Sequence, residues 1–244
     1  RTLKKILKNW NWFEIIFLIV SYIALTLCFV LGTEKNTFSF IVSLVGVSSV
    51  MLVAKGLTIA PIVSIIYNIL YATLSVTQKY YGETIIYTVI MIPLSIISLV
   101  SWVKNKNGGK EEQVQVNKIS KKEYLILSLV IVALTIGFYF LLKALHTNEL
   151  IVSTISLVAP VISAYLMLRR SSYYAICFIA SNAVLIVLWG LSIKTAGAGF
   201  LPTICSFVIF TVLDVYGLIH WKQEEKRQNK ETQENKEPIE DKAN

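Results

Sequence analysis

Residues 82–103 read GETIIYTVIMIPLSIISLVSWV, a run whose only charged side chain is Glu83 at its start. About 20 apolar residues in a helix cross a hydrocarbon core of ~30 Å, so this run predicts a transmembrane helix. A polar stretch, KNKNGGKEEQVQVNKISKK, follows at 104–122. Seven more apolar runs lie on either side, at 12–32, 37–54, 58–78, 123–143, 149–168, 172–193 and 199–221. The sequence therefore predicts an all-α polytopic membrane protein with eight transmembrane helices.

The composition agrees with this prediction and excludes several other classes of protein. The 244 residues are 55% hydrophobic and 16% charged, with a net charge of +8, whereas soluble domains average about 25% charged residues. We therefore expect a lipid bilayer, and no nucleic acid, around the chain. Three cysteines within apolar runs and two distant histidines predict no metal site, no cofactor and no catalytic triad, so we expect no enzyme.

The basic residues predict the orientation in the membrane. Under the eight-helix assignment, 19 of the 23 Lys and Arg residues lie on the side that holds both termini and the 104–122 linker. Lys and Arg accumulate in cytoplasmic loops, so we expect both termini in the cytoplasm. The tail 222–244 is polar and without aromatic residues, and we expect it to be disordered.

The two halves of the chain resemble each other. Matching residues recur in order, at offsets that grow only across loops: Glu14 with Glu123, Ala24-Leu25-Thr26 with Ala133-Leu134-Thr135, Ile41-Val42-Ser43 with Ile151-Val152-Ser153, Asn68 with Asn182, and Trp102 with Trp221. We infer a duplication into a first repeat at 1–103 and a second at 123–221, joined by the linker 104–122. Four spans per repeat give two parallel copies, and such transporters bind substrate between the repeats at mid-depth.

Polar side chains in the middle of the spans are the candidate substrate-binding residues. Asn68 and Asn182 lie at mid-span, with Tyr71 and Trp189 on their respective helix faces at i+3 and i+7. An amide in hydrocarbon must face the bundle or a cavity, so these residues either hold helices together or contact a flat ring that bears an amide or hydroxyl groups.

The fourth and eighth spans carry a second polar stripe. It includes Tyr87 and Ser95 and ends at Trp102; Asp214 corresponds to Ser95 at the offset that pairs Trp221 with Trp102. A carboxyl group within a span indicates a functional site, which here could bind sugar hydroxyls, pair with a cationic ring or carry a proton. We expect the two tryptophans to be interface anchors and the glutamates near span ends, Glu14, Glu83, Glu123 and Glu149, to be solvated.

The order and spacing of several residues over about 35–223 resemble the PnuC family of nicotinamide riboside transporters. These residues are Tyr81-Gly82-Glu83, Pro93 and Trp102 in the first half, and Arg169 or Arg170, Asn182, Trp189, Gly217 and Trp221-Lys222 in the second. The resemblance implies a bacterial inner (plasma) membrane facilitator with SWEET-like triple-helix bundles, a connecting helix and a homotrimeric assembly. It also implies uptake of nicotinamide riboside for NAD biosynthesis, with no cofactor, and a site lined by Asn182, Trp189 and the stripe on the fourth span.

The chain departs from the family pattern at some positions of the site. Tyr87 and Ser95 stand where the family commonly has Asn and Gln, and Ala175 and Phe178 stand where it commonly has Trp. The expected function is therefore uptake of a vitamin-like nucleoside, nicotinamide riboside first, by facilitated diffusion with alternating access. Transport of thiamine, riboflavin, a deoxynucleoside or a sugar, and a receptor or scaffold without transport, remain as alternatives.

Overall fold

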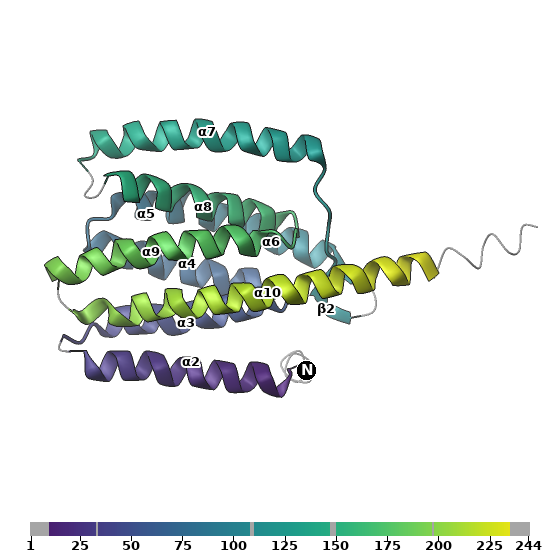
Figure 1. Cartoon of the computed structure of the whole chain (residues 1–244), viewed down its shortest axis with the longest axis horizontal. Helices are drawn as coiled ribbons and strands as arrows, with labels where there is room; N and C mark the ends of the chain where they lie inside the picture. Colours follow the sequence, from purple (N-terminus) through teal and green to yellow (C-terminus); the bar gives the residue numbers. More distant parts are fainter. Residues whose placement is uncertain (1–9, 33, 108–109, 147–149, 197, 235–244) are drawn as a thin grey trace, which may run out of the picture.

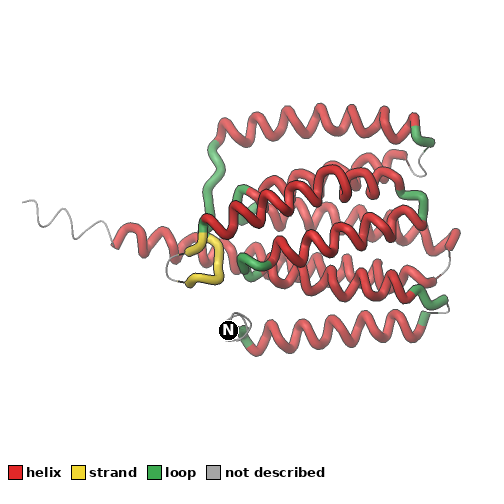
Figure 2. Tube along the Cα trace, turned by 180° about the vertical axis from the view of Figure 1, so that it is seen from behind, coloured by secondary structure: helices red, strands yellow, loops and turns green. Residues whose placement is uncertain are grey.

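The structure, a computed structural model, describes residues 10–32, 34–107, 110–146, 150–196 and 198–234. Eight of its helical segments are long and apolar enough to cross a membrane, as predicted. They are α2 (Trp12–Leu31), α3 (Thr37–Ala54), α4 (Ala60–Thr77), a fourth segment at Tyr81–Lys104, α7 (Lys121–Ala144), α8 (Leu150–Leu168), α9 (Tyr174–Ala196) and α10 (Leu201–Glu234), which follows the short 3-10 helix η2 (Ala198–Phe200). Figures 1 and 2 show these helices running side by side along one axis.

The helices pack in an arrangement that parallels the predicted repeats. α2 and α7 lie at opposite edges of the bundle (Figure 1). α2 packs against α3 and α10, and α7 packs against α8 and against α5 in the fourth span. If α2 to the fourth span correspond to α7 to α10, each edge helix contacts the second span of its own half and the fourth span of the other half. The duplication stays a prediction, but it accounts for this pairing.

The fourth span is not a uniform α-helix. It divides into α5 (Tyr81–Ile86), a π-helical turn η1 (Tyr87–Met91) and α6 (Ile92–Lys104), with Pro93 at the start of α6. A π-helical turn within an α-helix frequently marks a functional site, and proline cannot donate a backbone hydrogen bond to the preceding turn. The span can therefore bend near Tyr87 and Met91, which are both buried.

The linker side of the bundle is more ordered than the sequence predicted. The strands β1 (Lys106–Asn107) and β2 (Lys110–Val114) pair antiparallel within the 104–122 linker. Farther along, the Val114 N–H donates to the Gly56 carbonyl and the Asn117 N–H to the Arg170 carbonyl, both at 2.9 Å. Gly56 and Arg170 take positive φ angles of 64° and 59° at the turns that follow α3 and α8, so the linker binds the corresponding turn of each half.

The expected disorder of 222–244 is wrong for 222–234, which continue α10 beyond the apolar part of the helix. Arg227 pairs with Glu224 and with Glu231, three and four residues away, a spacing that stabilises a helix face. The Val116 N–H also donates to the Gln228 side chain at 2.9 Å. The contacts with the linker add tertiary support that the composition of the tail did not reveal. Residues 235–244 lie outside the described part of the chain.

Candidate functional site

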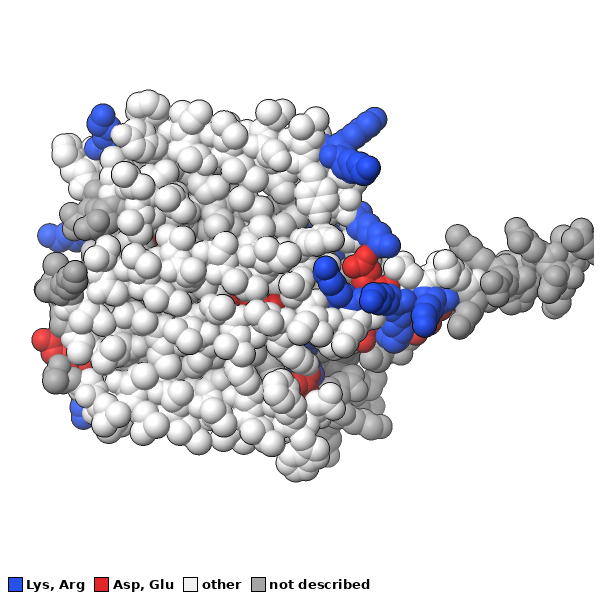
Figure 3. Space-filling model, viewed as in Figure 1, with Lys and Arg blue, Asp and Glu red and all other residues white. Residues whose placement is uncertain are grey.

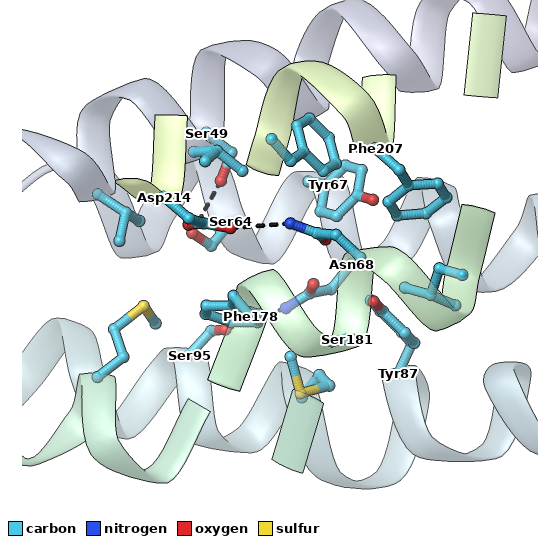
Figure 4. Close-up of a pocket in the computed structure, with 17 residues that line it drawn as sticks. Ser49, Ser64, Tyr67, Asn68, Tyr87, Ser95, Phe178, Ser181, Phe207 and Asp214 are labelled. Atoms are coloured by element: carbon cyan, nitrogen blue, oxygen red, sulfur yellow. Dashed lines mark hydrogen bonds between the residues drawn. The ribbon is translucent and has the colours of Figure 1, made fainter. Parts of the chain in front are cut away.

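A cavity lies between the two halves of the bundle. It has about 70 Å³ of free volume, room for about five water molecules at ~10–15 Å³ each. Its walls come from α3, α4 and the fourth span in the first half and from α8, α9 and α10 in the second. Figure 4 shows polar and aromatic side chains from these helices converging on it. The lining includes five of the seven residues predicted to bind substrate: Asn68, Tyr87, Ser95, Asn182 and Asp214.

The two mid-span asparagines make equivalent hydrogen bonds. Asn68 Nδ2 donates to Ser95 Oγ at 3.0 Å, and Asn182 Nδ2 donates to Asp214 Oδ2 at 2.9 Å. Ser95 and Asp214 are the two residues that the sequence aligned between the halves, so each half contributes an amide held by its own fourth span. All four side chains are buried. The interactions hold helices together and orient the amides at the cavity, and contact of the amides with a substrate stays a prediction.

Tyr71 and Trp189 do not line the cavity but cover its end on the side away from the linker. Trp189 Nε1 donates to the Tyr71 hydroxyl at 2.8 Å, and both side chains are fully buried. The Tyr71 ring lies 4.4 Å from that of Tyr87, while Tyr80 and Phe200 pack against Trp189. We call Tyr71, Tyr80, Trp189 and Phe200 the outer aromatic layer. The predicted helix faces were correct, but both residues lie closer to the helix ends than the cavity does.

Trp102 and Trp221 form a second layer on the linker side, and their predicted role as interface anchors is wrong. Both are buried, and their rings lie 5.6 Å apart. Trp102 Nε1 donates to the Met167 carbonyl and Trp221 Nε1 to the Val53 carbonyl, each at 3.0 Å. The hydrogen bonds cross between the halves, because each tryptophan binds the end of the second span of the other half. We call this pair the inner aromatic layer.

Sequence reasoning missed other residues that line the cavity. Ser49 and Ser64 share a hydrogen bond of 2.9 Å between α3 and α4, and Ser181 precedes Asn182 on α9. Aromatic walls come from Tyr67, Phe178, Phe207 and Phe210. Two of these rings were not missed, since Phe178 stands at a position where the family commonly has Trp and Phe210 corresponds to Met91 of the polar stripe in the first half. The serines could not have been found, because serine is common at helix interfaces in membranes.

The glutamates of this group that the structure describes are not fully solvated as expected, with 3% of the Glu14 side chain and 19% of the Glu123 side chain exposed. Glu14 is buried and pairs with Lys55, while its other oxygen accepts from the Tyr216 hydroxyl at 2.6 Å. Glu123 binds Arg169 through two hydrogen bonds of 2.6 and 3.0 Å, and this contact raises the pKa of Arg169. Lys55 and Arg169 both follow the second span of their half. Glutamates at similar places in α2 and α7 thus anchor both edge helices near the linker.

Glu83 is likewise buried, with 2% of its surface exposed. The Ser156 hydroxyl on α8 donates to Glu83 Oε1 at 2.6 Å, so this carboxyl group joins the two halves at the outer end of α5. Glu149 lies outside the described residues. Among the described residues, no three His, Cys, Asp or Glu side chains gather in a way that could hold a metal ion.

Comparisons with known proteins agree with this fold. The family described as nicotinamide mononucleotide transporter matches residues 36–223. The chain is 24% identical over 230 residues to a protein named nicotinamide riboside transporter PnuC from Neisseria mucosa, covering 92% of this chain and 86% of that protein. A crystal structure of the vitamin B3 transporter PnuC matches with a TM-score of 0.80 and 22% identity, covering 91% of this chain and 96% of that one. At that identity, the structural likeness shows the fold alone.

Proposed function

Since the chain belongs to the nicotinamide mononucleotide transporter family, we propose that it carries nicotinamide riboside across a membrane by facilitated diffusion. The observation that carries this proposal is the cavity between the halves, where amides, a carboxyl group and aromatic rings meet at mid-depth. Asn68 and Asn182 suit a carboxamide or ribose hydroxyls, and the rings of Tyr67 and Phe207 suit a flat pyridinium. Membership in a transporter family also favours transport over catalysis.

The charge of the site favours the riboside over its phosphate ester. Asp214 is the acidic side chain among the described residues that line the cavity, and no Lys or Arg is among them. A phosphate group would require cationic or N–H donors to offset its charge, whereas the pyridinium ring of the riboside is itself a cation. Asp214 would therefore attract the riboside and repel the mononucleotide.

The two aromatic layers support alternating access. The inner layer (Trp102 and Trp221) and the outer layer (Tyr71, Tyr80, Trp189 and Phe200) each combine residues from both halves. Separating the halves at one end would open one layer while the other stays closed. Tyr87 and Met91 are the first and last residues of the π-helical turn in the fourth span, and both line the cavity. A bend at this turn would therefore move part of the cavity wall.

The orientation and the assembly are further parts of this proposal. Figure 3 shows most of the visible Lys and Arg side chains at the end of the molecule that carries the linker and the extension of α10. By the positive-inside rule this end faces the cytoplasm, with both termini, in a bacterial inner membrane. The homotrimer implied by the resemblance would be tested by the mass of the purified complex in detergent.

Uptake of labelled nicotinamide riboside into proteoliposomes tests the proposal. We expect saturable uptake by the wild type, a strong reduction in Asn182→Ala, and wild-type uptake in Val187→Ala, an exposed position on the same helix. Competition by nicotinamide mononucleotide should be weak. Uptake no faster than in empty liposomes would refute transport of the riboside, and ligand binding without flux would instead indicate a receptor.

Thiamine is the second candidate substrate, because its thiazolium ring is also a cation that Asp214 could attract. The same liposomes distinguish the two compounds by competition. If unlabelled thiamine inhibits riboside uptake more strongly than unlabelled riboside does, thiamine binds more tightly, and uptake of labelled thiamine then shows whether it is the better substrate. Neutral vitamins such as riboflavin would gain nothing from the carboxylate and should compete poorly.

A further inference from the structure

Four carboxyl groups lie in the apolar parts of the described spans, and they fall into two classes. Glu14 and Glu123 each pair with a cation, Lys55 and Arg169 respectively. Glu83 and Asp214 have no Lys or Arg partner within 4.0 Å in the described part of the chain, although they are 2% and 3% exposed. A buried carboxylate without a counter-charge is costly in a membrane. The two unpaired acids therefore need an explanation that the two paired acids do not.

Glu83 is incompletely satisfied where it lies. Its Oε1 accepts from Ser156, but its Oε2 is buried without a hydrogen-bond partner among the described residues. Glu83 also lies in the first turn of α5, where the helix dipole supplies only about half a positive charge. Neither contact offsets a full negative charge, so a cation that comes near would stabilise the ionised form of this carboxyl group.

Close packing holds Glu83 at this place. A Cβ atom at Gly82 would lie 2.7 Å from Leu142 Cδ2 and 3.0 Å from Leu157 Cδ1. A larger residue here would force Leu142 to move, so glycine favours the close approach of α5 to α7 and α8 that brings Glu83 to Ser156 at the junction of the two halves. The carboxyl group is thus built into the interface that must separate when the outer side opens.

Glu83 also adjoins the route to the cavity. Tyr87 follows it by four residues, one helical turn deeper, and lines the cavity. The Tyr87 ring lies 4.4 Å from that of Tyr71 in the outer aromatic layer. Tyrosine rings along this route favour an organic cation, because the faces of the rings attract positive charge.

We infer that Glu83 is a specificity-determining residue that attracts the positively charged ring of the substrate at the outer side, before the ring reaches Asp214. This inference rests on the proposed function. The quaternary pyridinium nitrogen carries no hydrogen, so the recognition is of charge rather than a hydrogen bond. When the halves part, the bond from Ser156 breaks and both carboxylate oxygens face the entering substrate. The two unpaired acids then form successive sites for one cation.

The test compares nicotinamide riboside with its 1,4-dihydro form, which has the same ribose and carboxamide but a neutral ring. Glu83→Gln keeps an oxygen that can accept from Ser156 and removes the charge. In proteoliposomes we expect this variant to raise KM for the cation about tenfold and to leave KM for the neutral form within about twofold. Glu83→Asp should keep the preference for the cation. Glu34→Gln, which removes an exposed acid on the same side, is the matched control and should resemble the wild type.

Two results would overturn the inference. Equal losses for the two forms in Glu83→Gln would show that the side chain only holds the halves together, and an unchanged KM for the cation would show that its charge plays no part. If the wild type transports neither form, the proposed function fails separately. Charge recognition is then tested by thermal unfolding of the protein with 1-methylnicotinamide, a cation, and with nicotinamide, which is neutral. We expect the cation to raise the unfolding temperature more. No difference between these compounds in the wild type would refute it.

Discussion

The two halves of the molecule place the same amide at the same depth but give it different partners. In the first half Asn68 binds the neutral hydroxyl of Ser95, and in the second Asn182 binds the carboxyl group of Asp214. The surrounding helices pack in corresponding pairs. The difference shows that one acidic side chain is enough to make two similarly built walls of a cavity chemically unequal.

The largest difference between the halves should appear in stability. Lys55 and Glu14 are 4% and 3% exposed, whereas Arg169, in the corresponding pair with Glu123, is 42% exposed. Lys55→Met leaves a buried carboxylate without its cation, and we expect it to lower the free energy of unfolding by about 3–5 kcal/mol. Arg169→Met should cost about 1 kcal/mol or less. Thermal unfolding in detergent measures both, and similar losses would mean that the two ion pairs are equivalent.

Removing the charge that distinguishes the cavity walls should have the next largest effect. Asp214→Ser gives the second half the same residue that the first half has at the corresponding position, Ser95. We expect kcat/KM for nicotinamide riboside to fall about 30- to 150-fold, which corresponds to ~2–3 kcal/mol of lost transition-state stabilisation. Uptake kinetics of the variant measure this.

The exchanged double variant, Ser95→Asp with Asp214→Ser, sharpens the same comparison. If the walls are structurally equivalent, moving the carboxyl group across the cavity should restore part of the lost uptake. No recovery would show that the neighbours of Asp214, and not its charge alone, make the site.

Replacing either asparagine by alanine should reduce kcat/KM by a smaller factor, and the two factors should differ. Asn68→Ala removes a neutral hydrogen bond, and we expect a loss of about 1 kcal/mol, near fivefold in kcat/KM. Asn182→Ala leaves the buried Asp214 without its donor and should cost about 2 kcal/mol, near 30-fold. Thr73→Ala, at an exposed position on the same helix as Asn68, serves as the control. A larger loss for Asn68→Ala than for Asn182→Ala would reverse the proposed asymmetry of the site.

The smallest effect concerns the linker, which binds both halves. Gln228→Ala removes the bond from Val116, and we expect it to lower stability by about 0.5–1 kcal/mol with little change in KM. Detergent unfolding and uptake on the same preparation would measure both quantities. A raised KM would mean that this contact controls access to the cavity.

The sequence predicted the spans well because a helix that crosses a bilayer needs a long apolar run, and a run is visible without knowledge of contacts. It also identified Asn68, Asn182, Ser95 and Asp214, since polar groups are conspicuous among apolar residues. It misjudged Glu83, Trp102 and Trp221, because all three lie near span ends, where the same residue types commonly meet water. Their burial depends on how the halves pack, for example on the close approach at Gly82.

The linker contacts also constrain how the chain is made. Its backbone binds the turn after α3 through Gly56, the turn after α8 through Arg170, and Gln228 near the end of α10. The chain emerges from the ribosome in order, so the first half and the linker are translated well before two of these three partners exist. These contacts cannot all form until α10 has been translated as far as residue 228, and a chain stalled before that residue would lack the third contact of the linker.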